Sequence, residues 1–262
     1  MENKPMLHLL KIGGAIVDDP VLLEEALLAF AAVPHAKILV HGGGQAANDL
    51  AQKLGIEPVM LNGRRVTDAA TLDIVTMVYA GLLNKRMVAR LQALGCNSLG
   101  LSGADLNIIR ATLRPPHPVD YGFAGDIQEV NVPQLDQLLR LGMVPVCCAI
   151  THDKAGQLLN TNADTIASGL ATAMSALYDV ELYYCFTKPG VLADPDKPET
   201  VIPDIHPDNY RQLKSSGVIR DGMIPKLENA FLALERGVSR VIIGSVAAIH
   251  PDSKAVKTVI RR

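Results

Sequence analysis

Short apolar runs alternate along the chain with longer segments in which apolar residues recur every three or four positions. The short runs predict β-strands and the longer ones predict helices, because one face of a helix repeats every 3.6 residues. Strand and helix pairs are predicted at residues 6–12 and 21–32, at 37–41 and 45–54, and at 58–61 and 69–94. Further strands are predicted at residues 97–101, 143–150, 182–186 and 240–243.

This alternation is typical of an α/β protein, since a helix after each strand returns the chain to begin the next strand in the same direction. We therefore predict a three-layer αβα sandwich around a central, mostly parallel sheet. Residues 111–130 interrupt the alternation with a proline-rich stretch, and we predict loops and a hairpin at the sheet edge there. A proline- and aspartate-rich patch at residues 193–198 interrupts the last third, and we place a boundary between two lobes slightly earlier, near residue 175.

The composition argues against several classes of partner. A net charge of −2 over 262 residues gives no field that would attract a nucleic acid or an anionic membrane, and the absence of Trp argues against a platform for base stacking. No apolar stretch approaches the ~20 residues of a membrane span, and the N-terminus lacks the apolar segment of a signal peptide. The four cysteines form no CxxC pair. We expect a cytoplasmic protein that binds small molecules.

The first candidate site follows the first predicted strand, at Lys11-Ile12-Gly13-Gly14. Ligands of parallel sheets gather at the carboxyl ends of strands, and glycines there let backbone N–H groups approach phosphate oxygens. A lysine beside such a turn supplies positive charge. The alternative is an ordinary tight turn between a strand and a helix, with a lysine that reaches solvent.

The second candidate is His41-Gly42-Gly43-Gly44-Gln45, between a predicted strand and a helix. With Ala47 it also fits a relaxed dinucleotide-binding fingerprint, and Arg64 and Arg65 would suit a 2′-phosphate, so an NADP-dependent oxidoreductase is an open alternative. Against it, an earlier strand already carries its own lysine and glycine pair. The chain contains no GxxxxGK[ST], GxSxG or HExxH string and no Cys/His metal array.

Two further motifs open predicted helices. Asn160-Thr161-Asn162-Ala163-Asp164 precedes a helix at residues 165–177, where Asn162 or Asp164 is a candidate N-cap and Asn160 could bind a ligand's amide or carboxylate. Residues 221–226, DGMIPK, open a helix that runs to about residue 235. Lys226 faces the positive end of that helix dipole, so either it is solvated or a negative group such as a phosphate or Asp164 compensates it.

Taken in order, KIGG at residues 11–14, HGGGQ at 41–45, NGRRVT at 62–67, LLNTNAD at 158–164 and DGMIPK at 221–226 resemble the amino-acid kinase family, and within it the members that phosphorylate N-acetyl-L-glutamate. The similarity extends over nearly the whole chain. Residues 62–67 are the most discriminating, because they resemble that family's substrate-binding arginine loop. The resemblance implies an acylamino-acid-binding and dimerisation lobe at residues 1–175 and a nucleotide-binding lobe at residues 176–262.

The resemblance also implies a role for each motif. Lys11 and Lys226 would stabilise charge on the transferred phosphoryl group, and Asp164 would hold their ammonium groups apart and oriented. The acylated amino acid would be bound by Gly43, Gly44, Arg65 and Asn160, with Arg65 gripping a carboxylate. The nucleotide would be bound by Gly13, Gly14, Thr187, Lys188 and Gly190, and Gly44 would also offer its N–H to phosphate.

The implied substrates are ATP and an N-acylglutamate, with Mg²⁺ held through the nucleotide phosphates. A glutamate γ-carboxylate has a reference pKa of about 4.3, so it is ionised at neutral pH and needs no general base. Phosphoryl transfer then depends on positioning and charge neutralisation, which two lysines supply. The product would be an acyl phosphate of arginine biosynthesis.

The chain departs from the family pattern at two places. Cys185-Phe186-Thr187-Lys188-Pro189-Gly190 replaces a frequent Ser/Thr-Asp-x-x-Gly turn, where a lysine could still meet ATP phosphates. Residues 147–151, CCAIT, replace a segment of small residues near the acyl site, so N-succinyl-L-glutamate stays an alternative substrate.

Two further expectations concern the assembly and the activity. The arginine-inhibited members carry an extra N-terminal helix that builds a hexamer, and only ten residues precede Lys11 here, so we expect an arginine-insensitive homodimer. A non-catalytic amino-acid sensor of the same fold is another alternative, although a sensor has no need of both Lys11 and Lys226.

Overall fold

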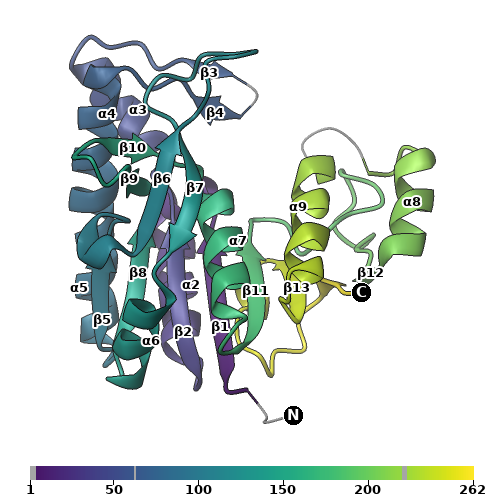
Figure 1. The fold of residues 1–262 in the computed structure, drawn as a ribbon. Helices are drawn as coiled ribbons and strands as arrows, with labels where there is room; N and C mark the ends of the chain where they lie inside the picture. Colours follow the sequence, from purple (N-terminus) through teal and green to yellow (C-terminus); the bar gives the residue numbers. More distant parts are fainter. Residues whose placement is uncertain (1–3, 62, 220–222) are drawn as a thin grey trace.

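The computed structural model describes residues 4–61, 63–219 and 223–262 and places an eight-stranded sheet at the centre of the molecule. The strand order is β12-β14-β13-β11-β1-β2-β8-β5 (Figure 1). The strands from β13 to β5 in this order run parallel, whereas β14 is antiparallel to β13. The strands of this sheet are β1 (Met6–Ile12), β2 (Ala36–His41), β5 (Ser98–Leu101), β8 (Val144–Cys148), β11 (Asp179–Cys185), β12 (Asp204–Ile205), β13 (Arg240–Gly244) and β14 (Lys257–Ile260).

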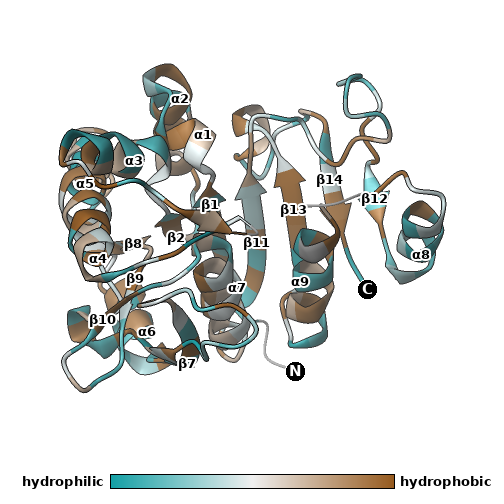
Figure 2. Cartoon of the chain, turned by 90° about the horizontal axis from the view of Figure 1, so that it is seen from above, coloured by the Kyte–Doolittle hydropathy of each residue, from teal (hydrophilic) through white to brown (hydrophobic). Residues whose placement is uncertain are grey.

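Helices cover both faces of this sheet, which confirms the predicted three-layer αβα sandwich. Viewed from above in Figure 2, α2 and α5 lie on one side of the strands and α6, α7 and α9 on the other. The helices and helical turns are α1 (Gly14–Val17), α2 (Pro20–Ala31), α3 (Gly44–Lys53), α4 (Ala69–Val75), the π-helical η1 (Thr76–Leu83), α5 (Asn84–Ala93), η2 (Asp105–Asn107), α6 (Val132–Arg140), α7 (Ala163–Met174), α8 (Pro207–Ser215), α9 (Met223–Glu235) and η3 (Val246–Ala248).

Two small sheets lie over the carboxyl ends of the central strands (Figure 1). One has the order β10-β9-β6-β7 and the other is the hairpin of β3 and β4. Their strands are β3 (Met60–Leu61), β4 (Arg64–Arg65), β6 (Ile109–Leu113), β7 (Gly125–Val130), β9 (Ile150–His152) and β10 (Leu158–Asn160). The hairpin predicted within residues 111–130 exists as β6 and β7, but it belongs to this separate sheet and not to the edge of the main one.

The strand predicted at residues 143–150 is wrong in its extent. It is divided at Ala149 into β8, which pairs with β2 and β5, and β9, which pairs with β10 and β6. The residues on both sides of the division are buried, so an unbroken apolar run results although the chain changes sheets. An apolar pattern reports burial and not the identity of the neighbouring strand.

The main sheet is continuous across the lobe boundary predicted near residue 175, since β11 pairs with β1 on one side and β13 on the other. The core is correspondingly continuous, with fully buried residues such as Leu9, Ile38 and Leu182 on neighbouring strands. Among the described residues, no helix is long and apolar enough to cross a membrane.

Candidate active site

Three charged residues from distant motifs meet at the carboxyl end of the central strands. Lys11 is the last residue but one of β1, and Asp164 lies in the first turn of α7. The Lys11 Nζ lies 2.7 Å from the Asp164 carboxylate. Lys11 is only 8% exposed, and burying an ammonium group that deeply requires a partner such as this carboxylate. The same motif also begins the helix: Asn162 is the N-cap of α7, and its side chain accepts hydrogen bonds from the backbone N–H groups of Asp164 and Thr165. The motif therefore both caps α7 and supplies the carboxylate that pairs with Lys11.

Lys226 approaches the same place from the first turn of α9. The ring of Phe186, the residue after β11, lies between the motifs: its centroid is 4.2 Å from Lys226 Nζ and 5.4 Å from Lys11 Nζ. The ring face is electronegative and attracts both ammonium groups. The structure thus brings Lys11, Asp164 and Lys226 together. Three other residues of the motifs, Asn62, Asp221 and Gly222, lie outside the described residues.

The electrostatics of Lys226 reflect this clustering. Burial lowers the pKa of Lys226, the negative charge of Asp164 opposes the lowering, and the positive charge of Lys11 adds to it. The site therefore concentrates positive charge with one carboxylate to hold it in place. Such an arrangement favours the binding of an additional anion. It would stabilise the negative charge of a phosphoryl group during its transfer.

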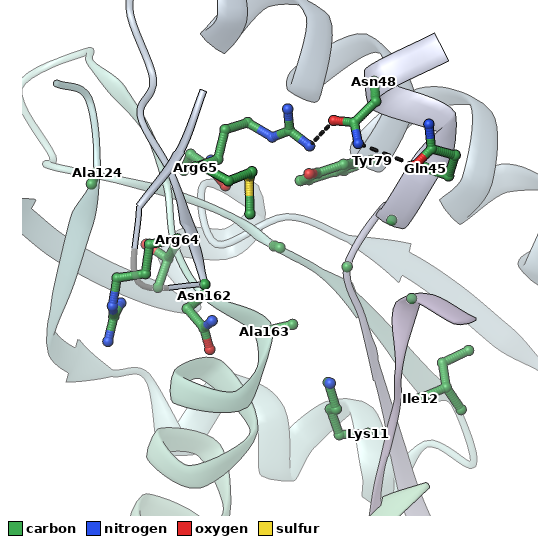
Figure 3. A pocket seen from close by; sticks show the side chains of 18 of the residues that line it. Lys11, Ile12, Gln45, Asn48, Arg64, Arg65, Tyr79, Ala124, Asn162 and Ala163 are labelled. Carbon is green, nitrogen blue, oxygen red and sulfur yellow. Dashed lines mark hydrogen bonds between the residues drawn. The ribbon is translucent and has the colours of Figure 1, made fainter. Parts of the chain in front are cut away.

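A cavity of about 540 Å³ opens above Lys11 (Figure 3). Its wall includes the two small sheets, the loop before α3 and the start of α7. Residues of the predicted substrate motifs that line it are Lys11, Gly14, Gly42, Gly44, Gly63, Arg64, Arg65, Asn160, Thr161, Asn162 and Ala163. Asp18, Gln45, Asn48 and Tyr79 also line it, and the sequence patterns did not single out Asp18, Asn48 or Tyr79.

The predicted carboxylate-binding residues hold side-chain donors at this cavity. Arg65 Nη2 donates to Asn48 Oδ1 at 2.5 Å, and Asn48 in turn donates to Gln45 (Figure 3). The Arg65 Nε is buried without a hydrogen-bond partner in the described part of the chain. Asn160 donates its amide N–H to Thr67 Oγ1 at 2.9 Å. Arg65 therefore keeps donors that a bound carboxylate would satisfy.

The glycines of the two turns differ in what they contribute. Gly44 has a φ of +42°, and a Cβ there would lie 2.5 Å from Asp18 Oδ2, so only glycine fits. A Cβ on Gly43 would overlap the ring of Tyr79. The backbone N–H of Gly13 donates to the Cys185 carbonyl at 3.1 Å, which corrects the expectation that it is free to bind phosphate. Gly14, which faces Gly44 and lines the cavity, keeps that role as a prediction.

A buried polar network fixes the start of the glycine loop. His41 is fully buried, its Nδ1 lies 2.7 Å from the Gly42 carbonyl oxygen, and its Nε2 lies 3.1 Å from the Asn84 side-chain amide. Since the amide can only donate to Nε2, Nδ1 carries the proton and donates to Gly42. Burial lowers the pKa of His41 to about 4, so the ring is neutral.

A second cavity, of about 680 Å³, is lined by Phe186 and Lys226. The predicted nucleotide-binding residues Thr187, Lys188 and Gly190 line it, together with apolar side chains such as Val191 and Ile219. A small recess lined by Asp164, Phe186 and Lys226 adjoins the second cavity, with which it shares Phe186 and Lys226. Phe186 was missed as a site residue, because its position beside Lys11 follows from the pairing of β11 with β1, in which Cys185 lies opposite Ile12, and not from a local sequence pattern.

Within the described ranges, no group of three or more His, Cys, Asp and Glu side chains is placed to hold a metal ion. The residues present therefore fit a metal ion only if the ion brings most of its ligands with it, as one bound to nucleotide phosphates does.

Comparison with known proteins identifies relatives of the whole chain. The acetylglutamate kinase of Phocaeicola vulgatus is 51% identical over 97% of this chain and 98% of its own length. That of Bacteroides thetaiotaomicron is 53% identical over 94% of this chain and 96% of its own.

Solved structures share the fold at low sequence identity. Carbamate kinase from Giardia lamblia superposes with a TM-score of 0.70 at 15% identity and covers the whole of both chains. N-acetylglutamate synthase from Neisseria gonorrhoeae gives a TM-score of 0.80 at 20% identity, over 99% of this chain and 60% of that one. Residues 6–245 match the family model described as the amino acid kinase family. On its sequence, its sheet and the convergence of its motifs, the chain belongs to the amino acid kinase family.

Proposed function

We propose that the protein transfers the γ-phosphoryl group of ATP to the γ-carboxylate of N-acetyl-L-glutamate and so forms the acyl phosphate of arginine biosynthesis. The relatives named acetylglutamate kinase, similar over nearly the whole chain, supply the substrate class. The observation that carries the proposal is the placement of Lys11, Asp164 and Lys226 between two cavities.

The acylated amino acid takes the cavity above Lys11 and ATP takes the other. Arg65 and Asn160 bind the α-carboxylate and the amide of the acceptor, and the loop of Gly43 and Gly44 closes over it. The nucleotide lies along Thr187, Lys188 and Gly190, with its terminal phosphate beside Lys226. The γ-carboxylate then faces the γ-phosphorus across the lysine pair.

The reaction requires no general base, because a γ-carboxylate with a pKa of about 4.3 is already ionised at neutral pH. One carboxylate oxygen forms the new bond to phosphorus while the bond from phosphorus to the bridging oxygen of ADP breaks. Lys11 and Lys226 stabilise the negative charge spread over the phosphoryl oxygens, and Asp164 holds the Lys11 amine in place. Mg²⁺ bound to the ATP phosphates would neutralise part of their charge.

The remaining expectations extend this proposal. Residues 1–175 would bind the acceptor and residues 176–262 the nucleotide. All four cysteines are free and buried, which suits a reducing cytoplasm. A homodimer is supported by the outer position of β5 in the main sheet and by the exposed Met77 and Leu82 on the neighbouring helical segment.

Neither alternative activity is retained. The dehydrogenase reading of Gly42-x-Gly44 is not supported, because the match to the amino acid kinase family includes that loop. The sensor reading is not supported either, because relatives at about 50% identity are kinases.

The test is an assay that couples ADP release to a recorded signal, with N-acetyl-L-glutamate, free L-glutamate and L-aspartate as acceptors. Dependence of ADP release on N-acetyl-L-glutamate, and trapping of the acyl phosphate by hydroxylamine, are the expected results. Release of ADP at the same rate without any acceptor would refute the proposal.

A further inference from the structure

The acceptor cavity contains one positive charge that the proposed substrate does not use. Of the charged residues that line it, Lys11 pairs with Asp164, and the Asp18 carboxylate accepts from the backbone N–H of Gln45. Arg65 donates to the neutral amide of Asn48. Arg64 is half-buried and forms neither an ion pair nor a hydrogen bond with any residue that the structure describes.

The surroundings of Arg64 do not neutralise it. The nearby carboxylate of Asp126 is already paired with Arg114, whose guanidinium also lies over the Tyr121 ring at 5.7 Å. Burial lowers the pKa of Arg64 and the positive charge of Arg114 lowers it further, while Asp126 acts in the opposite direction. A guanidinium group stays charged even so. Within the part of the chain that the structure describes, Arg64 is therefore a partly desolvated cation that is not paired with an anion.

Arg64 and Arg65 cannot share one carboxylate of the substrate. They are consecutive residues of β4, so their side chains leave opposite faces of the strand. Figure 3 shows the two guanidinium groups at separate parts of the cavity, Arg65 beside Asn48 and Arg64 on the side of Ala124 and Asn162. If the γ-carboxylate lies at the lysine pair and the α-carboxylate at Arg65, as the proposed function requires, Arg64 faces the remaining part of the molecule, which is the acyl group.

We propose that Arg64 selects an N-acyl group that ends in a carboxylate. The preferred acceptor is then a glutamate whose amino group is acylated by one carboxyl group of a dicarboxylic acid, while the other carboxyl group stays free to bind Arg64. This inference rests on the proposed function and narrows its substrate class. N-acetyl-L-glutamate enters the same cavity but leaves Arg64 unpaired. An acyl carboxylate satisfies the guanidinium with charge-assisted, bidentate hydrogen bonds.

The test compares acceptors that differ in one charge. N-succinyl-L-glutamate is measured against its uncharged amide analogue, in which the terminal carboxylate is a carboxamide of nearly the same shape, and against N-acetyl-L-glutamate. We expect kcat/KM for the carboxylate to exceed that for the carboxamide by about 10- to 100-fold, the usual range for a hydrogen bond between charged partners. The difference should lie in KM, because the acyl group is remote from the phosphoryl transfer.

Variants of the chain show whether Arg64 causes the preference for the acceptor with the acyl carboxylate. Arg64→Met should abolish the preference, so that kcat/KM for the carboxylate and for the carboxamide become equal within about threefold, because the guanidinium group that distinguishes them is gone. Arg110→Met is the matched control: Arg110 pairs with Glu129 at 3.1 Å and does not line the cavity, so the preference should persist. Arg64→Lys keeps the charge without the planar fork and should retain part of the preference.

The outcomes separate this inference from the proposed function. Equal kcat/KM for the carboxylate and the carboxamide in the unmodified protein would overturn the role of Arg64 and leave the kinase intact. A preference that survives Arg64→Met would also overturn it. Absence of ADP release with all three acceptors would instead refute the proposed function.

Discussion

At the scale of single residues, the burial of Lys11 shows how the site is held. An ammonium group on a central strand would be costly to bury alone, but its amine lies 2.7 Å from Asp164 and faces the ring of Phe186. Among the residues that the structure describes, no carboxylate lies so close to Lys226, and burial lowers the pKa of Lys226. The two lysines therefore differ in their surroundings: Lys11 is paired with a carboxylate, whereas Lys226 is the lysine that we expect to pair with a phosphate of the nucleotide.

Removing either ammonium group should reduce catalysis with the fold intact. For Lys11→Ala and Lys226→Ala we expect kcat to fall by about 10²- to 10³-fold, as for other preorganised groups that stabilise transition-state charge. Lys214→Ala is the control, because Lys214 is exposed and paired with Glu228 on the surface. Steady-state ADP release and circular dichroism are the measurements. If both variants turn over within twofold of the unmodified protein, the lysines do not perform the chemistry.

His41 should make the stability of the protein depend on pH below 6.5. Its pKa is about 4 in the folded protein because of burial, against about 6.5 when unfolded. Between these values the unfolded chain binds a proton that the folded chain does not, so the free energy of unfolding falls as the pH decreases from 6.5 to 4. The loss is about 1.4 kcal/mol for each unit of pKa difference.

Urea unfolding at pH 4.5 to 7.5 checks this dependence. We expect a His41→Gln variant to be less stable at pH 7 but to lose less stability as the pH is lowered, because glutamine does not titrate. Parallel curves for the variant and the unmodified protein across this range would mean that His41 does not cause the effect.

At the scale of elements, the loop between β2 and α3 depends on close packing against η1. Gly43 lies against the Tyr79 ring and Gly44 against the Asp18 carboxylate, so residues from three segments define one wall of the acceptor cavity. The loop is held from below by His41 and Asn84. Its shape is therefore set by the neighbours and not by the glycines alone.

A methyl group on this loop should disturb the acceptor cavity. In Gly43→Ala the new Cβ would overlap the Tyr79 ring, so the loop or the ring must move. We expect kcat/KM for the acceptor to fall at least tenfold, since small misplacements of positioning groups have large kinetic effects. Gly81→Ala, in η1 with no atom within 4 Å of its added Cβ, is the control and should behave as the unmodified protein. Unchanged kcat/KM in Gly43→Ala would contradict this account of the loop.

At the scale of the whole molecule, one sheet supports both cavities. β1 is central and carries Lys11, while β11 and β13 extend the sheet beneath the second cavity. The outer strand β5 at the opposite end pairs only with β8, among the strands described, and leaves an edge. Such an edge is usually covered in a stable protein.

The proposed homodimer predicts a molecular mass in solution near twice the 28.0 kDa of the chain. Light scattering coupled to gel filtration measures this mass, and ADP release in the presence of millimolar arginine should be unchanged. A hexamer, or inhibition by arginine at that concentration, would show the expected assembly to be wrong.

The sequence by itself determined the elements and the motifs. The strand at residues 6–12 matches β1, the helix at 45–54 matches α3 within one residue, and Asn162 caps α7 as one alternative predicted, because these features depend on local periodicity and backbone hydrogen bonding. Local patterns did not reveal that residues 143–150 pass from one sheet to another. Nor did they reveal that the Gly13 N–H donates to the Cys185 carbonyl, or that the Phe186 ring lies beside both lysines. These facts were decided by tertiary structure, since they depend on which strands become neighbours. The charge of Arg64, which no described residue pairs with, belongs with them, because it depends on how the other segments fold around the cavity.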